Sequence, residues 1–230
     1  MKTEQIFDLS FKQVGIGMLV LVGVFILTFS SRTARISQSK AIIGTITTDL
    51  YLKSDIKLNE LLEIMDSTNI EFDKEELKWV SPLLGWRRFK KGRYSFDGEY
   101  SYNEFLTKLA FGSQDPIPVT ILPGITVERF SRNLGSVMSF DSVDVMNVFS
   151  DSSFIASRGL TKEQVFGRML PDTYNIYWTS SAENIIEKIL NEFESRVEKP
   201  YKSRADSLGY SIDEVIAMAS IVEWEANIED

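Results

Sequence analysis

The amino-acid sequence predicts an α+β protein that begins with one transmembrane helix and continues with two globular parts. An uncharged apolar stretch lies near the N-terminus, strand-like and helix-like patterns follow it, and a segment rich in Gly, Ser and Pro at 112–118 divides them. With 230 residues, 43% of them hydrophobic, the chain can bury one medium core or two small ones. We expect a tail at 1–12, a transmembrane helix at 13–31, a module at 44–112 and a second domain at 118–230.

The N-terminal apolar stretch is long enough to cross a membrane. Residues 14–29 are almost continuously apolar, and no charged residue occurs between Lys12 and Arg32. A cleaved signal peptide is the alternative, although 28–30 is a poor cleavage site. Basic residues flank the stretch on both sides: Lys2, Lys12, Arg32, Arg35 and Lys40. More of them follow it than precede it, which slightly favours a cytoplasmic C-terminal part.

The composition excludes several kinds of chemistry. A net charge of -8 argues against nucleic acid as a partner. The chain contains no cysteine and no histidine, which excludes disulfides, Ser-His-Asp and Cys-His nucleophile systems, and most zinc sites. Neither a run of metal ligands nor a Gly-rich phosphate loop occurs, so we expect no metal and no cofactor. Any acid–base chemistry must therefore come from carboxylates, tyrosine or lysine.

The module at 44–112 mixes strand and helix patterns. The predicted elements are a strand at 45–51, helices at 58–65 and 74–84, a strand at 91–96 and a helix that begins at Ser101. The last of these helices turns four residues inward: Tyr102, Phe105, Leu106 and Leu109. Such an arrangement is typical of a small α+β module. Trp79 and Trp86 could stack on sugar rings, and packing in the core is the alternative.

The second domain is predicted to contain more helix than strand. The predicted elements are a strand at 119–122, a turn at 123–124, helices at 126–134, 141–150 and 161–167, a β-prone segment at 170–178 and two longer helices. The first longer helix runs from Ala182 to about Val197 and is capped by Ser181. It turns three residues inward: Ile185, Ile189 and Phe193.

The last helix carries the most informative pattern in the chain. Ser211 and Glu214 form a capping box, which starts this helix. Six apolar residues share one face and are called the apolar stripe below: Ile212, Val215, Ile216, Ala219, Val222 and Ala226. Glu223 lies in the middle of this stripe, whereas Glu225 lies at its far edge beside Glu214.

The position of Glu223 suggests catalysis. A carboxyl group in apolar surroundings is expensive to ionise, so its pKa rises toward the range in which it donates a proton at neutral pH. A glycosidase general acid requires this property, and Glu223 is therefore the candidate catalytic residue. The alternative is a core glutamate that pairs with an arginine or lysine from elsewhere in the fold.

Four motifs, in order, resemble the endolytic murein transglycosylase family of bacteria, also called YceG-like. Lys-Gly-Arg-Tyr at 91–94 is similar to a strand of the family's membrane-proximal module, which is similar to a LysM domain. Leu-Pro-Asp-Thr-Tyr at 170–174 is similar to its Pro-Asp-Thr-Tyr segment, and Tyr-Trp-Thr-Ser at 177–180 to a run in some members. Ala-Ser-Ile-Val-Glu-Trp-Glu-Ala at 219–226 resembles the family's catalytic helix, whose first glutamate falls on Glu223.

The resemblance implies a function. It implies a LysM-like module at 44–112 and an α/β catalytic domain at 118–230 that cleaves the MurNAc–GlcNAc bond of peptidoglycan and leaves 1,6-anhydro-MurNAc ends. This reaction contributes to cell-wall assembly and glycan chain termination. The resemblance implies that Glu223 is the acid–base residue. Asp172 and Tyr174 then hold the sugar or the catalytic helix, or only pack on that helix.

The resemblance also implies a location and partners. Because the substrate lies outside the cytoplasm, the tail at 1–12 is expected to be cytoplasmic and the globular part at 44–230 extracytoplasmic, anchored in the bacterial inner membrane by a single pass. This orientation contradicts the slight bias of the basic residues. Peptidoglycan glycan strands, the membrane and peptidoglycan synthases are the implied partners, without a cofactor. The alternative function is a non-catalytic, membrane-anchored peptidoglycan-binding or scaffold protein.

The chain departs from the family in two places. Pro123-Gly124 lacks the acidic residue that the family often has between these two residue types. Members of the family also continue past the catalytic helix, whereas this sequence stops at Asp230, so we expect a C-terminally incomplete member. Val222 and Ala226 should then be partly exposed to solvent, the last turn should fray, and the chain should have little or no lytic activity.

Overall fold

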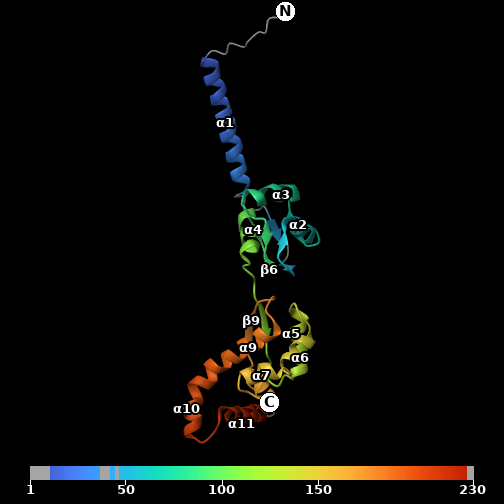
Figure 1. The fold of residues 1–230 in the computed structure, drawn as a ribbon, viewed down its shortest axis with the longest axis vertical. Helices are drawn as coiled ribbons and strands as arrows, with labels where there is room; N and C mark the ends of the chain where they lie inside the picture. The colour runs from blue at the N-terminus through green and yellow to red at the C-terminus, as the bar shows by residue number, and fades with distance from the viewer. Residues whose placement is uncertain (1–10, 37–41, 45–46, 227–230) are drawn as a thin grey trace, which may run out of the picture. The chain divides into compact units, whose positions relative to one another are not determined.

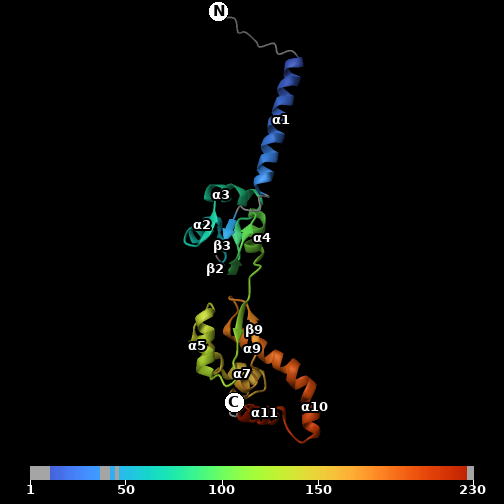
Figure 2. The ribbon, with the colours of Figure 1, turned by 180° about the vertical axis from the view of Figure 1, so that it is seen from behind.

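A computed structural model describes residues 11–36, 42–44 and 47–226. The chain divides into two compact units, Met1–Ser113 and Gln114–Asp230. Figures 1 and 2 show these units from opposite sides. Most of the tail predicted at 1–12 lies outside the described residues, as does the start of the strand predicted at 45–51.

The first helix, α1 (Phe11–Ile36), contains the predicted apolar stretch. Its segment Val14–Ser31 has a mean hydropathy of 2.3, and none of it is buried within the structure. By length and composition this helix can cross a membrane, although an N-terminal signal sequence has the same properties. The prediction of one long apolar N-terminal helix is confirmed, with bounds wider than 13–31.

The globular part of the first unit combines short antiparallel strands with three helices. The strands are β1 (Ile42–Gly44), β2 (Thr48–Leu52), β3 (Ile56–Lys57), β4 (Ile70–Phe72), β5 (Arg88–Phe89), β6 (Gly92–Phe96) and β7 (Glu99–Tyr100). The helices are α2 (Leu58–Asp66), α3 (Lys74–Leu83) and α4 (Tyr102–Phe111). The strands form one sheet in the order β4-β1-β7 and two pairs, β2-β6 and β3-β5. Several of these strands are too short to show a period-two pattern in the sequence.

Local signals in the sequence explain the helix α4. Ser101 and Glu104 form a complete capping box at its start. Gly112 ends the helix with a φ of 73°, a conformation that glycine adopts without steric cost. The four residues predicted to face inward are all buried. Trp79 and Trp86 are half-buried and pack against the same core, so packing accounts for at least part of their surface.

The second unit begins with an antiparallel strand pair. Strand β8 (Ile117–Thr120) pairs with β9 (Thr173–Ile176). The linker predicted at 112–118 is therefore shorter, because Ile117 and Pro118 belong to β8. Proline is compatible with a two-stranded ladder, since each strand has an edge that needs no hydrogen-bond donor. The prediction of an α/β domain is wrong for the described residues: consecutive helices separate β8 from β9, and the strands return antiparallel.

Helices make up most of the rest of this unit. They are α5 (Val127–Val137), α6 (Ser142–Val148), α7 (Ser152–Ser157), α8 (Lys162–Gly167), α9 (Ala182–Phe193), α10 (Lys199–Ser207) and α11 (Ile212–Ala226). The short helix α7 has no counterpart in the sequence prediction. In α9, the three residues predicted to face inward are buried.

A π-helical turn explains why the helix predicted to end near Val197 continues. The segment η1 (Glu194–Glu198) joins α9 directly to α10. The Lys199 N–H group donates to the carbonyl oxygen of Glu194, which is five residues earlier instead of four. This wider register lies just before Pro200, a residue that has no N–H group and clashes with the normal α-helical ladder. A proline that usually ends a helix is thus accommodated inside one.

Helix α5 provides a test of the packing. A Cβ atom added at Gly135 would lie 2.4 Å from the backbone nitrogen of Ser142, at the start of α6. We expect Gly135→Ala to lower the free energy of unfolding by about 1–3 kcal/mol, because α6 must move away. Gly167→Ala is the matched control in α8, where an added Cβ meets nothing within 4 Å. That control should be neutral or slightly stabilising in urea unfolding followed by circular dichroism; equal effects of the two variants would contradict this packing.

Candidate functional site

Helix α11 begins as the sequence predicts. The Ser211 N–H and hydroxyl groups both donate to Glu214 Oε2, at 2.8 and 2.9 Å, and the Glu214 N–H donates to Ser211 Oγ at 3.2 Å. The hydrogen bond from the Ser211 backbone, followed by that from its hydroxyl, lowers the pKa of Glu214. This capping box satisfies the first free amides and fixes the residue at which the helix starts. Figure 1 shows α11 turning back from the end of α10.

The apolar stripe of α11 is covered only at its start. Ile212 is buried, and Val215 and Ile216 are half-buried against a small cluster that includes Phe193 and Ala205. The other members of the stripe, Ala219, Val222 and Ala226, are exposed, Val222 to 68%. The expectation that Val222 and Ala226 are solvent-exposed is confirmed. The helix nevertheless continues through Ala226, so fraying of its last described turn is not seen.

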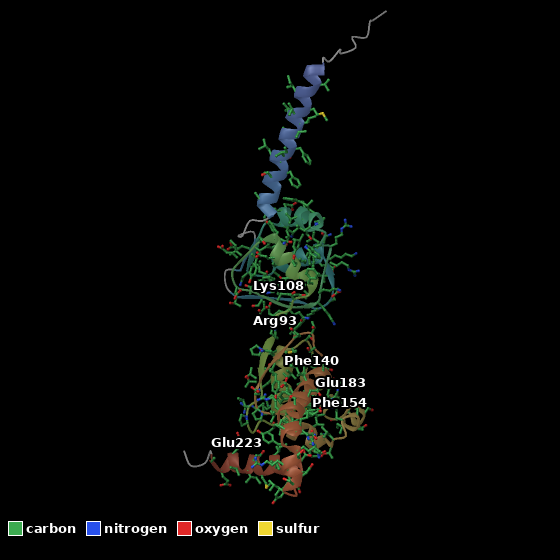
Figure 3. The ribbon with its side chains drawn as sticks, turned by 90° about the vertical axis from the view of Figure 1, so that its left-hand side faces the viewer. Arg93, Lys108, Phe140, Phe154, Glu183 and Glu223 are labelled. Atoms are coloured by element: carbon green, nitrogen blue, oxygen red, sulfur yellow. The ribbon has the colours of Figure 1, made fainter. Side chains whose placement is uncertain are left out.

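Glu223 lies on the exposed part of α11 (Figure 3). Within the described ranges, no hydrogen bond or ion pair joins it to another side chain, so it is not a core glutamate paired with a cation. The apolar surroundings predicted for it are also absent there, because its neighbours on the stripe are exposed. Glu225 is exposed as well, so burial does not distinguish the two carboxylates.

The first turn of α11 is held by an arginine that the sequence analysis missed. Arg168, at the C-terminal cap of α8, donates from Nε to Asp213 Oδ1 at 2.9 Å and from Nη2 to Asp213 Oδ2 at 3.0 Å. Its Nη1 donates to Glu198 Oε2 at 3.1 Å, and the Gln164 amide donates to Asp213 Oδ2 at 2.8 Å. The guanidinium also lies 5.4 Å from the ring centre of Phe193. One side chain therefore connects α8, η1 and α11.

The charges in this network reinforce one another. The hydrogen bonds from Arg168 hold the pKa of Asp213 below its ordinary value, against the opposing effect of partial burial. The pKa of Arg168 is raised, chiefly by its hydrogen bonds with Asp213. In the sequence, Asp213 resembles an ordinary acidic residue of a first helical turn, and nothing local indicates a partner so distant in the chain.

Asp172 lies in the turn before β9 and forms an ion pair. Arg196 of η1 donates from Nη1 to Asp172 Oδ2, and the Thr173 N–H donates to Asp172 Oδ1 at 2.7 Å. These contacts, the arginine first, lower the pKa of Asp172. Both side chains of the pair are substantially exposed. Asp172 thus links the turn before β9 to the π-helical turn.

Tyr174 is a core residue with a satisfied hydroxyl group. Its side chain is 5% exposed, and its hydroxyl donates to the carbonyl oxygen of Leu170 at 3.0 Å. Burial, more than the nearby Asp172, raises the pKa of Tyr174 to about 12. Leu170 in turn packs against the cluster that holds Ile212. In the described part of the chain no hydrogen bond or ion pair joins Asp172 or Tyr174 to Glu223; the contacts of both residues stabilise the turn before β9.

Comparison with known proteins adds the family. The sequence model of the YceG-like family matches residues 50–230. The chain belongs to the YceG-like family. This is the endolytic transglycosylase family that the four motifs resemble. The match includes the segment 170–174, Arg168, Asp213 and the whole of α11.

A solved structure named as a yceG-like protein is similar to this YceG-like chain. It is a 2.6 Å crystal structure of a yceG-like protein from Listeria monocytogenes, with 18% sequence identity and a TM-score of 0.45. The alignment covers 79% of this chain and 65% of that one. No protein of curated function matches this chain.

The second unit also contains a small polar cavity. It has a volume of about 210 Å³ and is lined by Ser157, Arg158, Leu160, Arg168, Leu190, Phe193, Glu194 and Glu198. Glu223 does not line it. Among the described residues, no group of three acidic side chains comes together to hold a metal ion.

The contact between Arg168 and Asp213 predicts a pH dependence. Because the pKa of folded Asp213 lies below the ordinary value of 3.8, the folded state binds its proton more weakly than the unfolded chain does. Its stabilisation is fully present above pH 3.8 and is lost as the pH falls through the folded pKa. Between pH 6 and pH 3, we expect the free energy of unfolding to fall less in Asp213→Asn than in the wild type, as measured by urea titrations. Asp206→Asn, at an exposed position of α10, is the control; an unchanged slope in Asp213→Asn would contradict the assignment.

Proposed function

We propose that this chain is an endolytic peptidoglycan lytic transglycosylase that cleaves the MurNAc–GlcNAc bond of nascent glycan strands and leaves 1,6-anhydro-MurNAc ends. The observation that carries this proposal is the family match across 50–230, which includes the helix with Glu223. The composition supports it, because a chain without histidine or cysteine must use carboxylates, tyrosine or lysine for proton transfer.

In the proposed reaction Glu223 acts alone. Its carboxyl group protonates the glycosidic oxygen as the bond to the muramyl anomeric carbon breaks. The resulting carboxylate then takes the proton of the muramyl 6-hydroxyl, whose oxygen bonds to the same carbon. The carboxyl group is thereby restored. Because the substrate supplies the nucleophile, no second carboxylate is needed at a fixed separation, unlike in an ordinary glycosidase.

The proposal requires cover for the exposed part of α11. A carboxyl group that is open to water has no reason to stay protonated near neutral pH. Val222 and Ala226 beside it are exposed and could be covered by apolar groups. We propose that sequence following the catalytic helix in longer members of the family supplies this cover and part of the sugar groove.

The location and partners follow from the substrate. We propose that α1 anchors the protein in the bacterial inner membrane, with the globular part at 44–230 outside the cytoplasm, where peptidoglycan lies. Peptidoglycan synthases are proposed partners, because a lytic enzyme that ends nascent strands must act where they are made.

Replacement of Glu223 tests the reaction. Glu223→Gln keeps the shape of the side chain but cannot cycle a proton, so we expect it to lower the formation of anhydro-muramyl ends by about 10²–10⁴-fold. Glu225→Gln is the control and should have a mild effect. Purified murein is incubated with each variant, both in the chain as it stands and in a version lengthened at its C-terminus, and the ends are identified by mass spectrometry.

The outcomes separate the parts of this proposal. We expect activity in the lengthened version and little in the chain as it stands. Equal activity in both would show that the site closes without additional sequence. Equal losses in the Glu223 and Glu225 variants would refute the choice of Glu223, and no anhydro ends in either wild-type version would refute lytic activity.

A groove in the first unit favours a second candidate function, peptidoglycan binding without catalysis. The groove has a volume of about 300 Å³ and is lined by Lys57, Leu58, Asn59, Pro82, Trp86 and Arg87. The Trp86 ring meets Phe111 edge to face at 5.3 Å between ring centres, which helps to orient it. An aromatic ring beside two cations suits a sugar that carries a carboxylate. Arg87 begins a basic segment that ends at Arg93. The net charge of -8 of the whole chain does not reveal this local excess of positive charge.

Trp86→Ala tests this groove. If the proposed LysM-like module binds glycan there, the variant should lose about tenfold in affinity for purified sacculi, equivalent to about 1.4 kcal/mol. Trp79→Ala is the control, because Trp79 packs on the same core without lining the groove. Co-sedimentation and thermal unfolding are measured for both variants. Binding that is unchanged in Trp86→Ala would remove the groove as a glycan site.

A further inference from the structure

We propose that Arg168 is a positioning residue that sets the direction of α11 and thereby places Glu223. This inference rests on the proposed lytic function of Glu223. The structural part, that Arg168 fixes the direction of the helix, can be measured without activity.

The geometry around Arg168 is suited to fixing a direction. A guanidinium group that donates from two nitrogens to both oxygens of one carboxylate makes a planar contact, which restrains rotation as well as distance. Arg168 makes this contact with Asp213 and reaches Glu198 with its third nitrogen. Its side chain is only 14% exposed, so water weakens these contacts less than it would at the surface.

Little else restrains α11 in the described structure. Ile212 is buried and Val215 and Ile216 are half-buried, but from Ala217 onward the helix is exposed wherever its side chains are described. Glu223 lies ten residues after Asp213 in the same helix, or about 15 Å along its axis. A helix that is restrained only near its start can tilt about its first turn.

A small change in the tilt of α11 displaces Glu223 by a large distance. A tilt of about 10° at Asp213 would move Glu223 by roughly 2.6 Å at a rise of about 1.5 Å per residue. A misplacement of about 1 Å can cost about 10²-fold in rate, because proton transfer requires the acid at hydrogen-bond distance. A weaker contact at Arg168 should therefore reduce turnover far more than it reduces stability.

The first unit contains a matched control. Arg93 donates from Nε to Asp49 Oδ2 at 3.0 Å and from Nη2 to Asp49 Oδ1 at 2.8 Å, and its side chain is 16% exposed. This pair joins β2 and β6, which five residue pairs already hold in register. The chemistry resembles that of Arg168 and Asp213, but no helix depends on it for direction.

Spin-label distances test the positioning directly. The chain has no cysteine, so Glu183→Cys on α9 and Ser220→Cys on α11 give two unique labels at exposed positions. The distance distribution between them is measured by pulsed EPR in the full chain in detergent. We expect Arg168→Lys to widen it about twofold, because lysine keeps the charge but not the planar contact. Arg93→Lys should leave it unchanged. A distribution that stays narrow in Arg168→Lys would overturn the inference.

Kinetics provide the second measurement. The variants are assayed in the version lengthened at its C-terminus, in which we expect lytic activity. There we expect Arg168→Lys to lower kcat by about 10–100-fold, with KM changed less than about threefold. Arg93→Lys should leave both values near wild type. A fall in melting temperature without a fall in kcat would show a merely structural role and overturn the inference. Arg168→Lys could widen the distance distribution while the wild-type protein never forms anhydro ends. That result would refute the proposed function but leave the role of Arg168 in directing α11 intact.

Discussion

The C-terminal helices of the second unit are joined by a bidentate contact between a guanidinium and a carboxylate. Arg168 joins the end of α8, the π-helical turn η1 and the first turn of α11. Removing either partner would leave a partly buried charge without its counterion, which costs more than an exposed pair would. Among the described residues, the hydrogen bond from Gln164 and the small cluster around Ile212 are the other contacts that hold the start of α11. The direction of the helix therefore depends more on this contact than on apolar packing.

In the proposed site, the position of Glu223 and the apolar cover of its carboxyl group have separate origins. The contact at Arg168 can place Glu223, but it cannot exclude water from the carboxyl group, because the neighbouring part of the apolar stripe is exposed to solvent. Catalysis by one carboxyl group needs both conditions, the correct location and a raised pKa. The carboxyl group of such a site can be in the correct location and still be inactive until another apolar surface covers it. Asp172 and Tyr174 stabilise the turn before β9, through Arg196 and the carbonyl oxygen of Leu170.

The sequence predicted features whose causes lie within a few residues. The helix start at Ser101, the capping box at Ser211 and the inward faces of α4 and α9 agree with the structure, because hydrogen bonds and periodicity act locally. The continuation of the chain through Pro200 was not predictable in this way. Proline ordinarily ends a helix, and only the shift to a π register lets α10 follow.

By itself, the sequence determined the N-terminal apolar helix, the start of α11, the motif on which the proposal for Glu223 rests and the absence of histidine and cysteine chemistry. The tertiary structure decided which charges meet and which apolar residues are covered. It brought Arg168 to Asp213 and Arg196 to Asp172, gave Tyr174 a role in the core, and left Val222 exposed. The reason is physical: periodicity shows which residues share a face, but burial depends on whether a second element lies over that face.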